Sequence, residues 1–94
     1  MAKIHYVIET EYDKGDIVLF KKDKKLFVGI VEGFYAEDNS VWYNIRISKD
    51  FVYTYSNGGG IAEWDIISKI DDNEDIKNFI VNGEQKIGWR EYDK

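Results

Sequence analysis

Few residues of this chain have the chemistry of a catalytic centre. The 94 residues include one histidine, His5, and no cysteine. His5 lies near the N-terminus on the more polar side of an alternating segment, and no nucleophile motif accompanies it. The lack of cysteine also excludes disulfides, thiolate metal sites and cysteine nucleophiles. We therefore predict that the protein is not an enzyme and has no catalytic residues.

Two acidic segments have part of the pattern of a known site but lack what would complete it. Glu63 and Asp65 would share one face of a strand, yet nothing nearby supports a glycosidase pair or a cation site. Residues 71–75 begin like a calcium loop, but Ile76 and Asn82 stand where such a loop needs glycine and glutamate. We expect ordinary solvated charges and helix capping here, with no metal and no cofactor.

Aromatic side chains are the strongest functional signal, with three Trp, seven Tyr and five Phe in the chain. Trp42 shares its strand face with Asn44 and Arg46, so it faces either water or a covering segment from one end of the chain. Exposed Trp, Tyr and Arg are the residue types that dominate binding hot spots. We predict a partner-binding surface made of Tyr35, Trp42, Arg46, Tyr55 and Trp64.

Three consecutive glycines, residues 58–60, lie beside this predicted surface. They lack the Gly-Lys-Ser/Thr ending of a phosphate-binding loop. Glycines in a row lose much conformational entropy on ordering. The segment is therefore either a mobile connector or a piece of backbone that another group approaches closely.

Charge bears on the class of partner. The net charge of −5 and a pI of about 4.8 argue against a general affinity for nucleic acid. Nucleic-acid binding nevertheless stays an alternative, because one hairpin tip is basic and consists of Lys21, Lys22, Lys24 and Lys25. A further alternative is a small acidic inhibitor protein from a mobile element, which would block a nucleic-acid-binding protein by presenting the carboxylates after Ile70 in place of phosphates.

The elements that must position these residues are short β-rich runs separated by polar turns. In the run 41–47, Val41, Tyr43, Ile45 and Ile47 point to one side and predict the core face. Residues 2–10 alternate in the same way and predict a further strand, and a 3₁₀ turn is expected near Trp64. The predicted central runs are residues 17–21, 26–35, 41–47, 51–55 and 61–70.

The pattern changes after Ile70. Residues 71–75 supply capping side chains, and Ile76, Phe79 and Ile80 form an apolar stripe with helical spacing. The sequence predicts a helix over residues 73–81 and a last strand within residues 85–92.

The segments Gly15-Asp16-Ile17-Val18, Val28-Gly29-Ile30-Val31 and Glu63-Trp64-Asp65-Ile66 give residues 13–70 a pattern that resembles SH3-like barrels of the KOW and Tudor type. The resemblance implies a small antiparallel barrel that binds proteins, peptides, RNA or DNA through loops and aromatic faces. The N-terminal strand and the helix–strand tail lie outside a minimal barrel of this kind.

We thus predict one mostly β domain over residues 1–94, with a barrel core at 13–70 and a helix–strand extension at 71–94. The predicted function is that of a non-catalytic binding or adaptor module for a protein or peptide. No run approaches the roughly 20 apolar residues that cross a bilayer, and no secretory signal is present, so we predict a cytoplasmic location.

Overall fold

The computed structural model describes residues 10–82, and this part of the chain is mostly antiparallel β-sheet with one short α-helix, as predicted. The predicted N-terminal strand, apart from Thr10, and the predicted last strand lie outside the described residues. The elements are β1 (Ile17–Lys22), β2 (Lys25–Glu37), β3 (Ser40–Ser48), β4 (Phe51–Tyr53), β5 (Ile61–Ala62), the 3₁₀ helix η1 (Glu63–Asp65), β6 (Ile66–Ile70) and α1 (Glu74–Asn82).

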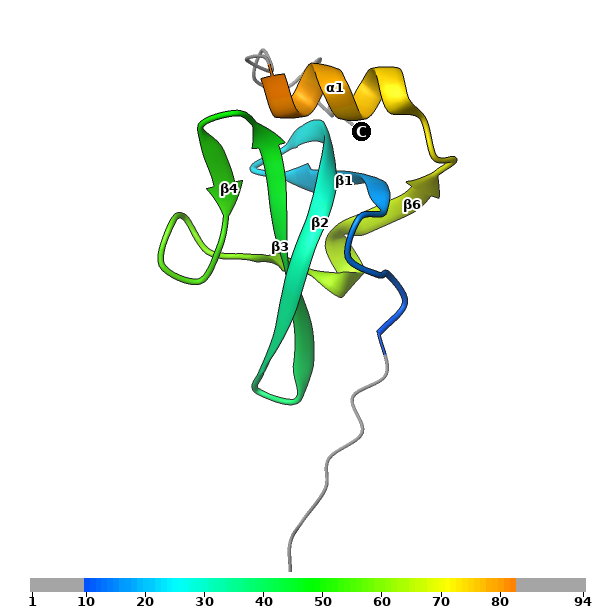
Figure 1. The fold of residues 1–94 in the computed structure, drawn as a ribbon. Coiled ribbons are helices and arrows are strands. Elements are labelled where there is room, and N and C mark those ends of the chain that lie inside the picture. Colours follow the sequence, from blue (N-terminus) through cyan, green and yellow to red (C-terminus); the bar gives the residue numbers. More distant parts are fainter. Residues whose placement is uncertain (1–9, 83–94) are drawn as a thin grey trace, which may run out of the picture.

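The strands form one curled sheet in the order β4-β3-β2-β1-β6 (Figure 1). β5 pairs with β3 on the edge that β4 also uses, through Trp42 opposite Ala62 and Tyr43 opposite Ile61. β6, a few residues further on, pairs with β1. Residues 61–70 therefore link the β3 edge of the sheet to the β1 edge, and η1 lies between the two pairings.

Tight polar turns set the register of the two long hairpins. Asp23 and Lys24 join β1 to β2, and Asp38 and Asn39 join β2 to β3. All four have positive φ, between 53° and 67°. Two-residue turns of this hand match the twist of antiparallel strands, and Asp and Asn tolerate the left-handed conformation better than most residues. The polar runs between strands predicted both turns correctly.

The inner face of the sheet holds the larger core. Tyr43 and Ile45 of β3 are fully buried there, together with the inward residues of β1 and β2. Ile47 is also buried and Val41 packs partly buried against them, so the predicted core face of β3 is confirmed. The cluster consists of Val18, Phe20, Phe27, Val31, Tyr43, Ile45, Ile47, Ile61 and Ile66.

Helix α1 covers the outer face of β1 and β2, which explains why both faces of these strands are apolar. Asn73 caps the helix, because its Oδ1 accepts a hydrogen bond of 3.1 Å from the Ile76 N–H. Ile80 is buried against Ile17 and Val28, and Ile76 packs beside them. Phe79 departs from the predicted stripe, because 52% of it is exposed.

Glycine shapes the contact between β2 and β3, and the next strand, β4, is shorter than predicted. A Cβ at Gly29 would meet Ile45 Cγ2 and lie 2.8 Å from the Arg46 carbonyl oxygen, so only glycine allows β2 and β3 to approach here. The β2–β3 register shifts between Val31 and Gly33, which marks a β-bulge at Glu32. β4 ends at Tyr53, earlier than predicted, and Tyr55 lies in the turn that follows.

Candidate functional site

Four of the five residues predicted to bind a partner lie together as a chain of aromatic rings. The Tyr35 and Trp42 rings are stacked with centroids 6.4 Å apart. Tyr55 meets Tyr35 edge-on at 5.7 Å, and Trp64 meets Trp42 edge-on at 5.6 Å. We call Tyr35, Trp42, Tyr55 and Trp64 the aromatic surface.

Each ring of the aromatic surface comes from a different element, and strand pairing brings them together. Tyr35 of β2 and Trp42 of β3 are direct cross-strand partners. The pairing of Trp42 with Ala62 places η1, and with it Trp64, beside the indole of Trp42. Tyr55 is supplied by the turn after β4. Non-local pairing thus gathers residues that are up to 29 positions apart in the sequence (Tyr35 to Trp64).

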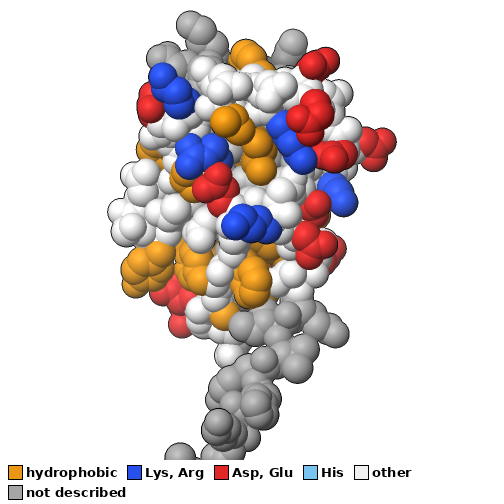
Figure 2. Space-filling model, in the orientation of Figure 1, with side chains coloured by type: hydrophobic (Ala, Val, Ile, Leu, Met, Phe, Trp, Pro, Cys, Tyr) orange, Lys and Arg blue, Asp and Glu red, His pale blue; other side chains and the backbone are white. Residues whose placement is uncertain are grey.

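The outer members of the aromatic surface are the accessible ones. Tyr55 is 68% exposed and Trp64 is 67% exposed, whereas Tyr35 and Trp42 are half-buried beneath them. Trp42 is thus partly covered by its aromatic neighbours and packs against Trp64, whereas the two chain ends that could also cover it lie outside the described residues. Hydrophobic side chains reach the molecular surface towards the β2–β3 hairpin as well as towards α1 (Figure 2).

The glycine-rich loop is held against Tyr35. The Gly60 N–H donates a hydrogen bond of 3.1 Å to the Tyr35 hydroxyl. A Cβ at Gly60 would lie 2.8 Å from that oxygen and 2.9 Å from the Tyr43 carbonyl oxygen. Gly58 and Gly59 have φ near 80°, which favours glycine. Close approach, one of the two predicted explanations, therefore accounts for this loop.

The hydroxyl group of Tyr43 holds η1 in place. Its hydroxyl donates a hydrogen bond of 2.5 Å to Glu63 Oε2 and accepts one of 3.1 Å from the Glu11 N–H. Burial and the hydrogen bond to Glu63 raise the pKa of Tyr43 to about 12. The phenol therefore stays neutral at physiological pH, and Glu63 has a structural role that the sequence did not reveal.

Arg46, the fifth predicted residue, is separate from the ring chain and is used inside the fold. Its Nε lies 2.7 Å from Glu32 Oε2, and its Nη1 donates to the carbonyl oxygens of Ser48 and Lys49 at 3.1 and 2.9 Å. The β2 bulge places Glu32 within reach of the guanidinium. These bonds fix the β3–β4 turn, so we assign Arg46 to the fold and leave it out of the aromatic surface.

The predicted basic tip lies at the β1–β2 turn, with Lys21 and Lys24 exposed. Lys22 turns towards the β4 side, where its Nζ lies 5.4 Å from the centre of the Tyr53 ring. A Cβ at Gly59 would lie 4.0 Å from the same nitrogen. The tip is therefore adjacent to the glycine-rich loop, while Lys24 and Lys25 extend the positive charge along the hairpin.

Carboxylates surround the aromatic surface. Glu37 follows Tyr35 by two residues in β2 and so shares its face, and Glu63 and Asp65 flank Trp64. Within residues 10–82, the ion pairs are Arg46–Glu32, Lys69–Asp16 and Lys77–Asp72, and none involves these three carboxylates. No group of three or more His, Asp or Glu side chains suited to a metal occurs in the same part.

Two buried polar atoms at the aromatic surface could not be predicted from the sequence. Trp42 Nε1 and Asn44 Oδ1 lie on the same face of β3, and neither has a hydrogen-bond partner in the described part of the chain. One is a donor and the other an acceptor. Sequence alternation places both side chains on one face but gives no indication of whether they find partners.

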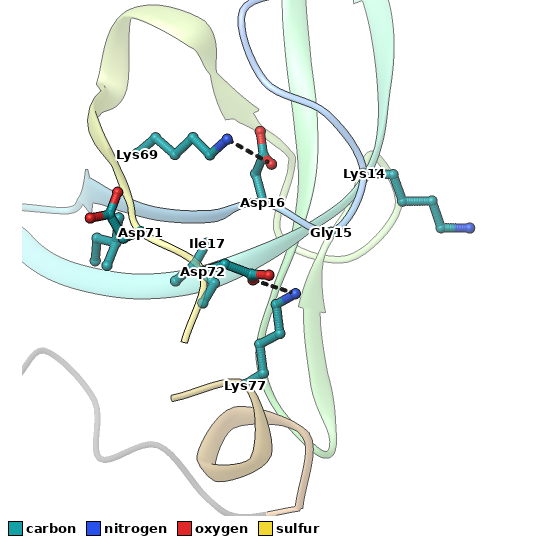
Figure 3. Close-up of a pocket in the computed structure, with 9 residues that line it drawn as sticks. Lys14, Gly15, Asp16, Ile17, Lys69, Asp71, Asp72 and Lys77 are labelled. Carbon is teal, nitrogen blue, oxygen red and sulfur yellow. Dashed lines mark ion pairs between the residues drawn. The ribbon is translucent and has the colours of Figure 1, made fainter. Parts of the chain in front are cut away.

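A second candidate site is a polar pocket of about 340 Å³ where β1, β6 and α1 meet (Figure 3). Lys69 Nζ lies 3.3 Å from Asp16 Oδ1, and Lys77 Nζ lies 2.7 Å from Asp72 Oδ1, while Lys14 points away from both pairs. Asp16 also closes its own turn by accepting from the Asp13 N–H at 2.8 Å. Two of the three lysines that line the pocket are thus paired: Lys69 joins β6 to the residue before β1, and Lys77 joins α1 to the loop that precedes it.

Comparison of the chain with protein-family models, with curated proteins and with solved structures gave no match. In the described part of the chain no helix is long and apolar enough to span a membrane. The resemblance to SH3-like barrels therefore stays a prediction that rests on the residues alone, and the aromatic surface is the feature from which a function can be argued.

Proposed function

We propose that this protein is a non-catalytic binding module that takes a protein or peptide segment on the aromatic surface. The observation that carries the proposal is the exposure of Tyr55 and Trp64 on top of two half-buried rings, Tyr35 and Trp42. Large apolar rings exposed to water are unfavourable, and a partner that covers them gains about 25 cal/mol for each Å² buried.

The rigidity of the surface supports the same proposal. Trp64 stands on η1, which the Tyr43–Glu63 hydrogen bond holds in place, and Tyr35 is fixed by the Gly60 N–H. Rings that are already ordered lose little conformational entropy when a ligand binds. A preorganised aromatic group of this kind is suited to an extended segment that lies across several rings.

The test is a selection of random peptides on the immobilised full chain, followed by calorimetry. We expect selected peptides to lose about tenfold or more in affinity for Trp64→Ala, the loss typical of a hot-spot residue. Phe79→Ala is the matched control, since Phe79 is also exposed but lies on α1. The proposal would be contradicted if both variants lost affinity to the same extent, or if Trp64→Ala left the affinity unchanged.

A second candidate function, binding of single-stranded nucleic acid, is supported by the position of Lys22 beside Tyr53 and the glycine-rich loop. Lysines next to tyrosine rings can combine phosphate contacts with base stacking. Anisotropy of a labelled RNA at low salt tests it, because neutralising Lys22, Lys24 and Lys25 to glutamine would abolish binding. The carboxylates around Trp64 oppose this function, so we rank it second.

A further inference from the structure

We infer that the partner segment presents an arginine side chain to the aromatic surface, and that its guanidinium lies against Trp64 within reach of Glu37 or Asp65. The inference rests on the proposed function and names the chemistry of the ligand. It depends on the combination of exposed rings with carboxylates that have no cationic partner in the described part of the chain.

The charge on the Trp64 side of the aromatic surface is negative. Glu63 accepts hydrogen bonds only from neutral donors among residues 10–82, the Tyr43 hydroxyl and the Glu11 N–H, so its negative charge is not balanced there. Asp65 is half-buried next to Trp64, and Glu37 lies on the Tyr35 face of β2. A cation brought to this surface is therefore attracted, whereas a phosphate is repelled.

The rings offer a second attraction for the same ligand. Cations bind over the faces of Trp and Tyr, and the indole is the strongest of these acceptors. The molecule already uses this contact once, where Lys22 Nζ lies over the Tyr53 ring. Arginine suits the surface better than lysine, because its planar guanidinium stacks on rings and pairs with a carboxylate at the same time.

Within residues 10–82, no ion pair joins a lysine or arginine to Glu37, Glu63 or Asp65. Arg46 is held by Glu32 and by two carbonyl oxygens at the β3–β4 turn. Lys22 lies over Tyr53, and Lys69 and Lys77 are paired at the pocket near α1. The described part of the chain therefore leaves the cation to be supplied by a ligand.

The test follows the indole N–H signals of ¹⁵N-labelled full-length protein during titration with a blocked Gly-Arg-Gly tripeptide. The control ligand replaces arginine with citrulline, which keeps the shape and removes the charge. We expect the Trp64 signal, assigned with Trp64→Phe, to shift at millimolar arginine peptide, and citrulline to bind roughly three- to thirtyfold more weakly. Asp65→Asn combined with Glu37→Gln should weaken arginine binding, and Asp75→Asn on α1 should not.

Failure of this inference can be told apart from failure of the proposed function. If randomly selected peptides bind through Trp64 but tolerate the exchange of every arginine for citrulline, the arginine inference is wrong and the binding function stands. If neither selected peptides nor the arginine tripeptide perturb Trp64, both are wrong. Binding of an RNA that requires Lys22 and leaves the Trp64 signal unmoved would also overturn the arginine inference.

Discussion

The Tyr43 hydroxyl donates a hydrogen bond to Glu63, 20 residues further along the chain, and this bond joins the central strand β3 to η1. The same hydroxyl accepts the Glu11 N–H. This hydroxyl therefore connects three segments, β3, η1 and the residues before β1, and η1 carries Trp64. The position of Trp64, the more exposed tryptophan of the aromatic surface, therefore depends on Tyr43, which is fully buried.

Replacement of Tyr43 by phenylalanine should destabilise the protein. The change removes the hydroxyl from between the Glu63 carboxylate and the Glu11 N–H, which keep only their own hydrogen bond of 3.3 Å, and the loss of such a bond to a charged group costs about 1–3 kcal/mol. Urea denaturation measures the loss in the free energy of unfolding. Tyr53→Phe, in a half-buried ring of β4, is the matched control, and equal losses in the two variants would contradict the role of the Tyr43–Glu63 bond.

Stability should fall in strong alkali, in a range set by Tyr43. Its pKa is raised from 10.0 to about 12 in the folded protein, so the folded state holds this proton more tightly than the unfolded chain. The resulting stabilisation is complete below pH 10 and is lost as the pH rises towards 12. Burial raises the pKa of Tyr12 and Tyr53 in the same direction. Denaturation curves between pH 9 and 12 test this, and Tyr43→Phe should make the decline shallower.

Alanine at Gly60 should damage both stability and the aromatic surface. The added Cβ would press on the Tyr35 ring and on the Tyr43 carbonyl oxygen, and overpacking of this kind costs about 1–3 kcal/mol. Gly33→Ala is the control, because its nearest neighbour would be 3.6 Å away. A Gly60→Ala variant as stable as Gly33→Ala would show that the loop is not held against Tyr35.

Helix α1 should be an integral part of the folded domain. Ile80→Ala removes a fully buried side chain from the contact with Ile17 and Val28, which we expect to cost about 2–5 kcal/mol. Phe79→Ala on the same helix should cost much less, since Phe79 is half exposed. Urea denaturation compares the two variants, and similar small losses in both would mean that α1 does not contribute to the core.

Much of the fold could be predicted from local sequence signals. Alternation in residues 41–47 predicts the core face of β3 correctly, because one face of that strand is buried and the other is not. Capping side chains predict α1 to within one residue. Both faces of β1 and β2 are apolar, and periodicity alone does not reveal that α1 supplies the cover on the outer side.

The site could be predicted in part. Residue type alone indicates Tyr35, Trp42, Tyr55 and Trp64, but their contact depends on β5 pairing with β3, a non-local relationship that a single sequence does not specify. Alternation groups Arg46 with them because it shares the Trp42 face of β3. The β2 bulge, which brings Glu32 to its guanidinium, is a tertiary feature that separates it from the rings.

The most direct measurement of the central claim is a map of backbone and indole N–H chemical shifts with a selected peptide bound to the full chain. We predict that the largest changes fall on the Trp42 and Trp64 indoles and on the backbone from Tyr55 to Gly60, and that Trp64→Ala abolishes them. Changes confined to α1, β6 or the polar pocket, with both indole signals unmoved, would contradict the account.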